Sequence, residues 1–221
     1  MIKAVIFDLD DTLISEREYI ESGFRHVSKI LSHHFGFDNK EINQLLVKLF
    51  NESPVKVFNR LFDELQIDYD NDVIKWLVNE YRNHEPKINF YDDVLPAIKK
   101  LKSKNIKTGI ITDGYAITQK QKIHALNAEK LFGEIIVTDE LGGKKFWKPN
   151  PKAFEIMSNK LNVAFEEMVY VVDNPEKDFY ISRIIPIKTI RIYRDGIYKN
   201  KHYLENVKEN CSIKSLKELI L

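Results

Sequence analysis

The chain has 221 residues, of which 43% are hydrophobic and 11% aromatic, a composition that supports a packed core and excludes a disordered chain. Its 34 basic and 33 acidic residues leave a formal charge of +1, so no overall field favours nucleic acid or a membrane surface. The longest apolar runs, 4–7 and 168–172, are far shorter than the ~20 residues of a membrane-spanning helix. With one cysteine and no signal-peptide pattern, the sequence predicts a soluble protein of the reducing cytoplasm.

The first predicted element is a buried strand over residues 2–7, whose apolar run ends at an acidic cluster. Helical patterns separate it from similar runs at 107–111, 135–137, 169–172 and 189–192. Strands that alternate with helices favour right-handed crossovers and a parallel sheet. The sequence therefore predicts a Rossmann-like α/β core.

One stretch, 15–86, interrupts this alternation because it contains no strand pattern. Apolar residues recur there at helical spacing in four blocks, and Ser53 followed by Pro54 is typical of a helix start and is expected to open the third block. The sequence therefore predicts a four-helix cap domain over 15–86, inserted into a core formed by 1–14 and 87–221.

An acidic cluster, Asp8, Asp10 and Asp11, follows the first predicted strand, at the edge of a parallel sheet where ligands bind in open α/β folds. Like charges this close repel unless a cation or a proton compensates. The cluster therefore predicts a metal site or an acid/base pair. The alternative is a solvated acidic turn in which Asp11 or Thr12 caps a helix.

After the second predicted strand, Thr112, Asp113 and Gly114 offer a hydroxyl and backbone N–H groups where the chain turns into a helix. Such groups bind phosphate oxygens, although a capped turn without a ligand is the alternative.

Two further segments complete the pattern. Lys148 precedes a helix that Asn150 and Pro151 are expected to start, with Lys144 and Lys145 as competing candidates for the same role. The fourth predicted strand ends at a second acidic pair, Asp173 and Asp178, for which helix capping by Asp173 is the alternative.

This ordered set resembles the motifs of the haloacid dehalogenase superfamily of phosphohydrolases. The first motif matches Asp8-x-Asp10-x-Thr12, the second Thr112, the third Lys148, and the fourth Asp173 with Asp178. The resemblance spans nearly the whole chain. The helical insertion lies between the first and second motifs, where members with a helical cap carry it.

The resemblance implies that Asp8 attacks phosphorus and that Asp10 serves as acid and base. It implies Mg²⁺ as the cofactor, whose charge would offset the repulsion between a carboxylate and a phosphate dianion. Oxygen ligands suit this ion. The implied site residues are Thr112, Asp113 and Lys148 for the phosphoryl group, Asp8, Asp10 through its carbonyl and Asp173 for the metal, and Asp178, Asn174 and Thr12 in support.

Asp10 also separates subclasses, because dehalogenases of this fold lack an acid at that position and expel a halide that needs no proton. Dehalogenation is therefore disfavoured. The chain departs from the family pattern at Val172, where glycine is frequent, which puts the close packing there in question. It also has Asp113 where many relatives have asparagine, and the effect on substrate choice is open.

The predicted function is hydrolysis of a small phosphorylated metabolite, such as a sugar phosphate or a nucleoside monophosphate. Two alternatives remain at this point. A phosphomutase would use the same aspartyl-phosphate but protect it from water. A binding or regulatory protein would have kept the fold without catalysis, and its expected sign is a lost motif residue.

Overall fold

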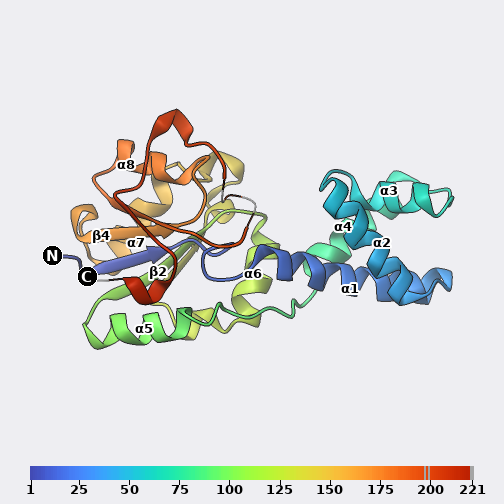
Figure 1. The fold of residues 1–221 in the computed structure, drawn as a ribbon, viewed down its shortest axis with the longest axis horizontal. Coiled ribbons are helices and arrows are strands. Elements are labelled where there is room, and N and C mark those ends of the chain that lie inside the picture. The colour runs from blue at the N-terminus through green and yellow to red at the C-terminus, as the bar shows by residue number, and fades with distance from the viewer. Residues whose placement is uncertain (197, 199, 220–221) are drawn as a thin grey trace. The chain divides into compact units, whose positions relative to one another are not determined.

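The computed structural model describes residues 1–196, 198 and 200–219, which divide into two compact units (Figure 1). The first unit comprises Met1–Glu16 and the described chain from Ile88 onward, and the second comprises Arg17–Lys87. The sequence analysis placed these boundaries after residues 14 and 86. Each unit has a buried hydrophobic cluster of its own.

The first unit is built on a six-stranded parallel sheet in the order β3-β2-β1-β4-β5-β6, which confirms the predicted α/β core. The sequence analysis missed β6, because three residues beside polar neighbours give too short a pattern. The strands are β1 (Ala4–Phe7), β2 (Lys107–Thr112), β3 (Glu134–Val137), β4 (Met168–Val172), β5 (Lys188–Ile192) and β6 (Cys211–Ile213).

Helices cover both faces of this sheet. Ala4 and Ile6 share one buried cluster with Phe154 of α7 and Ile181 of α8, whereas Phe7 packs its ring edge-on against Phe132 with 6.1 Å between centroids. Figure 1 shows α8 and α5 on opposite sides of the sheet. The helices of this unit are α5 (Val94–Ser103), α6 (Ala116–Ala125), α7 (Lys152–Leu161) and α8 (Ile181–Ile184).

The four predicted helices of the insertion are present, and none of the helices in the described residues is long and apolar enough to cross a bilayer. Asp38 and Asp70 start two of them, since each carboxylate accepts two backbone N–H groups of the first turn at 2.9 Å. The helices are α1 (Glu16–Phe35), α2 (Asn39–Glu52), α3 (Val57–Glu64) and α4 (Asn71–Asn83).

The predicted start of the third helix is wrong. Ser53 ends α2, since its N–H donates to the carbonyl of Leu49, and its hydroxyl accepts the N–H of Val55 in a local turn. Lys56 then takes a left-handed conformation, with φ at 51°, so α3 begins only after it. A capping hydrogen bond thus formed as expected, but it closes a turn and does not open a helix.

A largely buried ion pair fastens the turn that follows β1. The Arg194 guanidinium donates to the Asp93 carboxylate at 2.8 and 2.9 Å and to the carbonyl of Thr12 at 3.0 Å. Asp93 also accepts from the Ser215 hydroxyl and the Leu216 N–H, both at 2.9 Å. Burial raises the pKa of Asp93, but these donors and the Arg194 charge outweigh it, so the pKa is lowered overall. One carboxylate therefore joins α5, the C-terminal segment and the first-motif turn.

We expect Asp93→Asn to lower the free energy of unfolding of the first unit by about 2 kcal/mol near neutral pH, because hydrogen bonds to a charged group contribute about 1.5–3 kcal/mol. The pKa of Asp93 is lower folded than unfolded, so its contribution is present above the unfolded value of ~3.9 and is lost as the pH falls through the folded value. The difference between wild type and variant should therefore shrink below pH ~4.

Urea unfolding measures this difference in a Trp76→Phe background, where Trp147 of the first unit is the remaining tryptophan. Asp92→Asn, at the exposed neighbouring position, is the matched control. Equal losses in the two variants, or a difference that does not change with pH, would contradict the assigned role of Asp93.

Candidate active site

The carboxyl ends of β1 and β4 bring two sequence-predicted aspartates together. Asp8 directly follows β1 and Asp173 directly follows β4, and the two strands are neighbours in parallel register. The N–H of Asp8 continues the ladder by donating to the carbonyl of Val171 at 3.0 Å. Thr12, on the turn after β1, directs its hydroxyl toward Asp173 at 3.4 Å. Both aspartates are buried, so residues 165 positions apart share one small volume.

Lys148 lies at the centre of this volume, with only 1% of its side chain exposed. Its ammonium donates to Asp8 at 2.6 Å and to the Tyr170 hydroxyl at 2.8 Å, and it lies 3.3 Å from Asp178. Burial alone would lower the pKa of Lys148, but the carboxylates of Asp178 and Asp8 outweigh it and raise the pKa, so the ammonium stays charged. Neither Lys144 nor Lys145, the competing candidates, is buried.

Negative charge exceeds positive charge around Lys148. Burial raises the pKa of Asp8 to about 6 despite the attraction of Lys148, and the Asp178 carboxylate adds to the rise. Burial and the nearby Asp8 carboxylate raise the pKa of Asp173 well above its ordinary value. One carboxylate oxygen of Asp178 is buried without a hydrogen-bond partner. A further positive charge would reduce the electrostatic repulsion among these carboxylates.

The donor set fits a hard divalent cation. Two carboxylates at adjacent strand ends, with the nearby carbonyl of Asp10, are oxygen ligands of the kind that Mg²⁺ takes together with water. Within the described residues no three His, Cys, Asp or Glu side chains gather as a ready ligand cluster. The set implied by the motifs contains two such side chains and a main-chain oxygen, and is compatible with that finding.

The second-motif residues lie at the end of β2. Thr112 is buried, and its hydroxyl accepts from the Gln119 amide at 2.9 Å. Asp113 accepts from the Thr138 hydroxyl at 2.7 Å, from the N–H of Lys148 at 3.1 Å and from the Lys177 ammonium. Burial raises the pKa of Asp113, but the charges of Lys148 and Lys177 outweigh it and lower the pKa. An ionised carboxylate donates no hydrogen bond to phosphate, so this side chain positions two lysines.

The supporting positions have defined partners. The Asn174 side chain accepts the N–H of Glu176 at 2.9 Å, and its carbonyl accepts the N–H of Asp178, which shapes the loop between the two aspartates. Val172 is fully buried in the core cluster of the first unit, so the chain accommodates a larger side chain where glycine is frequent.

Three residues in this network escaped the sequence analysis. Tyr170 lies on β4, where it looks like a strand-core residue, and Gln119 and Lys122 lie on α6 among other polar residues. Gln119 donates to Asp10 at 2.8 Å and Lys122 donates to it at 2.7 Å. Their spacing of three places both on one helix face, which was the only available signal.

The carboxylates of the site line a pocket of about 290 Å³. Its lining includes Lys177 and the aromatic side chains of Trp147 and Tyr198. The acidic side chains that line it are Asp8, Asp10, Glu16, Asp113, Asp173 and Asp178. A pocket so rich in carboxylates would bind a phosphate only with cations present.

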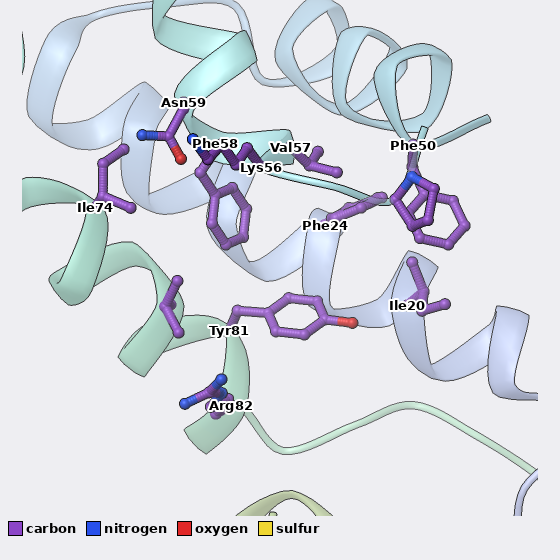
Figure 2. Close-up of a pocket in the computed structure, with 12 residues that line it drawn as sticks. Ile20, Phe24, Phe50, Lys56, Val57, Phe58, Asn59, Ile74, Tyr81 and Arg82 are labelled. Carbon is purple, nitrogen blue, oxygen red and sulfur yellow. The ribbon is translucent and has the colours of Figure 1, made fainter. Parts of the chain in front are cut away.

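The helical unit has a second pocket, of about 270 Å³, which Figure 2 shows. The aromatic rings of Phe24, Phe58 and Tyr81 line part of it. The side chains of Lys56 and Arg82 add cationic groups. Such a mixture suits a small ligand with an apolar part and an anionic part.

Comparison with known proteins assigns the family. The sequence profile described as haloacid dehalogenase-like hydrolase matches residues 5–192. The chain belongs to the haloacid dehalogenase-like hydrolase family. The predicted superfamily is thereby confirmed, and with it an enzyme of the hydrolase class.

Individual relatives of this HAD-like hydrolase align over nearly its full length. It is 29% identical to a glyceraldehyde 3-phosphate phosphatase of Methanocaldococcus jannaschii, over 100% of this chain and 96% of the relative. It is 26% identical to pyrophosphatase PpaX of Oceanobacillus iheyensis, over 99% of this chain and 95% of the relative. The crystal structure of a HAD phosphatase from Thermococcus onnurineus superposes with a TM-score of 0.61 at 25% identity. The superposition covers 99% of this chain and 96% of the other.

Asp113 of this HAD-like hydrolase allows a direct test of its positioning role. Asp113→Ala removes the acceptor of three donors, one of them the backbone N–H of Lys148, and should lower the free energy of unfolding by about 2–3 kcal/mol. Asp113→Asn keeps an oxygen for Thr138 and Lys148 but replaces the oxygen that accepts from Lys177 with an NH2 group, so about half of that loss is expected. Urea unfolding at neutral pH measures both variants. Equal losses would show that the charge, and not the acceptor oxygen, stabilises the turn.

Proposed function

We propose that this chain is a Mg²⁺-dependent phosphomonoester hydrolase that acts through an aspartyl-phosphate on Asp8. The observation that carries the proposal is the Asp8 carboxylate at the edge of the pocket, 2.6 Å from a buried Lys148 ammonium. A nucleophile beside a fixed cation is what attack on a phosphate dianion requires. Family membership and relatives named as phosphatases support the same reaction class.

The proposed reaction has two steps. An Asp8 oxygen forms a bond to phosphorus while the ester oxygen leaves and takes a proton from Asp10. Water then forms a bond to phosphorus while the bond between phosphorus and Asp8 breaks. The water gives a proton to Asp10, Asp8 is restored as a carboxylate, and inorganic phosphate leaves. Thr112 and Lys148 are proposed to hold the phosphoryl oxygens in both steps, with Asp113 orienting Lys148 through its backbone N–H.

The proposed metal ligands are Asp8, Asp173 and the carbonyl of Asp10, with Thr12, Asn174 and Asp178 supporting them. When bound, Mg²⁺ would supply positive charge that lowers the repulsion between the carboxylates and the phosphoryl group. The excess of buried carboxylates near Lys148 supports this assignment.

The substrate is proposed to be a small phosphorylated metabolite. Glyceraldehyde 3-phosphate is the first candidate, because the Methanocaldococcus relative that aligns with the whole of this chain is named a phosphatase of that compound. Pyrophosphate is the second candidate on the same ground. Other sugar phosphates and nucleoside monophosphates belong in the same panel. The reducing cytoplasm is proposed as the compartment, on the single cysteine of the chain.

The helical unit, Arg17–Lys87, is proposed to act as a cap that selects the substrate. Its insertion between the first and second motifs and its separate core support this role. Caps of this kind exclude water during the reaction and reopen for product release.

We expect Asp8→Asn to abolish phosphate release from every substrate, because no aspartyl-phosphate forms without the nucleophile. Asp173→Ala should weaken Mg²⁺ binding and lower turnover by orders of magnitude while the fold is kept, since a ligand at a strand end does not build the core. Phosphate release with and without Mg²⁺, and calorimetric titration of Mg²⁺ itself, measure the two effects.

The exposed Asp92→Asn variant is the control for both substitutions. Undiminished hydrolysis in excess chelator would contradict the metal assignment. Transfer of the phosphoryl group to a second hydroxyl without release of inorganic phosphate would indicate a mutase instead.

The pocket of the helical unit gives a prediction about selection. Lys56→Met and Asn59→Leu change polar groups of its lining, and should shift the ratio of kcat/KM between glyceraldehyde 3-phosphate and 4-nitrophenyl phosphate by about tenfold or more. Lys75→Met, at an exposed position of α4 outside the pocket, is the matched control and should leave the ratio unchanged. A ratio that stays constant in all three variants would remove this pocket from substrate selection.

A further inference from the structure

Two long polar side chains are buried on a short helix of the first unit. Gln119 and Lys122 of α6 are 1% and 2% exposed, although the helix also carries solvent-exposed lysines such as Lys120. Buried glutamine and lysine cost free energy unless each finds partners. Their partners therefore indicate why the chain keeps them inside.

Both side chains meet the carboxylate of Asp10, one on each oxygen. The Lys122 ammonium donates to Oδ1 at 2.7 Å, and the Gln119 amide donates to Oδ2 at 2.8 Å. The remaining contacts differ between the two donors. Gln119 also reaches the Thr112 hydroxyl at 2.9 Å and the carbonyl of Asp113. An amide nitrogen has two hydrogens, so these three oxygens share two hydrogen bonds.

This sharing distinguishes the two oxygens of Asp10. If the hydrogen bond to Oδ2 is given up, the Gln119 amide still has two acceptors in Thr112 and Asp113. Oδ1, in contrast, is held by the full charge of the buried Lys122 ammonium, and a charge-assisted hydrogen bond of this kind is stronger than a neutral one. Oδ2 is therefore the exchangeable oxygen and Oδ1 the fixed one.

We propose that Lys122 and Gln119 are positioning residues for Asp10, with Lys122 fixing Oδ1 and Gln119 yielding Oδ2 to the reacting oxygen. The proposal rests on the acid/base role given to Asp10 above. In the first step the proton moves from Oδ2 to the leaving oxygen, and in the second a proton of water moves to Oδ2. Gln119 also connects this group to Thr112, so one helix aligns the acid/base with a proposed phosphoryl contact.

A stabilising ion pair alone would not explain the arrangement. Replacing both members of such a pair by apolar residues of similar size is often neutral for stability, so stability alone does not explain why the chain keeps Lys122 and Asp10 together. Positioning is a different demand, because a misplacement of about 1 Å in a reacting group costs on the order of 10²-fold in rate.

The test uses pre-steady-state hydrolysis of 4-nitrophenyl phosphate, whose leaving group needs little protonation. Lys122→Met keeps the length of the side chain and removes its charge. We expect formation of the phosphoenzyme, seen as a burst of 4-nitrophenol, to fall less than about tenfold, while the following turnover falls by ~10²-fold for want of a positioned base. Dividing the steady-state rate by the burst amplitude, which reports the concentration of active sites, makes the ratio of the two rate constants independent of the folded fraction of the sample.

Three variants accompany it. Lys122→Arg keeps the charge and should recover turnover to within about tenfold of the wild type. Lys120→Met, at an exposed position of the same helix that pairs with Glu140, should match the wild type. Gln119→Met, which keeps Lys122, should give a smaller separation of burst and turnover than Lys122→Met, and it provides the measurement if Lys122→Met does not fold.

Asp10→Asn separates failure of this inference from failure of the proposed function. Suppose that Asp10→Asn shows a burst followed by slow turnover. If Lys122→Met then slows both steps equally, or slows neither step, the positioning role is overturned and the acid/base role of Asp10 stands. If Asp10→Asn does not separate the two steps, Asp10 is not the acid/base and both proposals fall. A Lys122→Met variant that behaves as Asp10→Asn, with recovery in Lys122→Arg, supports the inference.

Discussion

The burial of one lysine among carboxylates is the constraint on which the rest of the site depends. Lys148 is shielded from water, so its charge must be balanced by Asp8 and Asp178, which come from distant parts of the chain. Tyr170 completes the ring of acceptors and keeps its proton, because burial and the Asp178 charge raise its pKa. The site therefore forms only when three segments are positioned at the same time: the strand ends, the loop before α7 and the loop after β4. None of these segments can shift without leaving a charge unpaired in the interior.

The same constraint recurs at the partly buried Asp10 and at the buried Asp93, where carboxylates are again held by basic side chains from other elements. Each pair joins an edge of the sheet to a segment remote in sequence. The turn after β1 is thus held at three points: Asp8 by Lys148, Asp10 by Lys122, and the carbonyl of Thr12 by Arg194. A turn that carries several negative charges is in this way held by basic groups in addition to the buried side chains of Leu9 and Leu13.

The sequence allowed prediction of groups whose position follows from topology. Asp8, Thr112 and Asp173 follow apolar runs directly, and parallel strands bring their carboxyl ends to one edge, so adjacency follows from the order of elements alone. Gln119 and Lys122 could not be found in this way. In a helix with Lys120 and Gln121 between them, polar residues occur on every side, and only packing decides which of them face inward. The start of α3 was missed because Ser53 caps a turn, and the left-handed backbone at Lys56 has no sequence signature outside glycine and asparagine.

The position of β1 has a consequence for the order in which the protein is made. β1 is synthesised before the other strands of the sheet, yet its two neighbours begin only at Lys107 and Met168. The helical unit, Arg17–Lys87, has its own core, so this core can form before the later strands are synthesised. Until β2 and β4 have been synthesised, the apolar strand β1 has no neighbouring strand with which to pair. The sheet edge that carries Asp8 and Asp173 is therefore assembled only after the fourth strand has been synthesised.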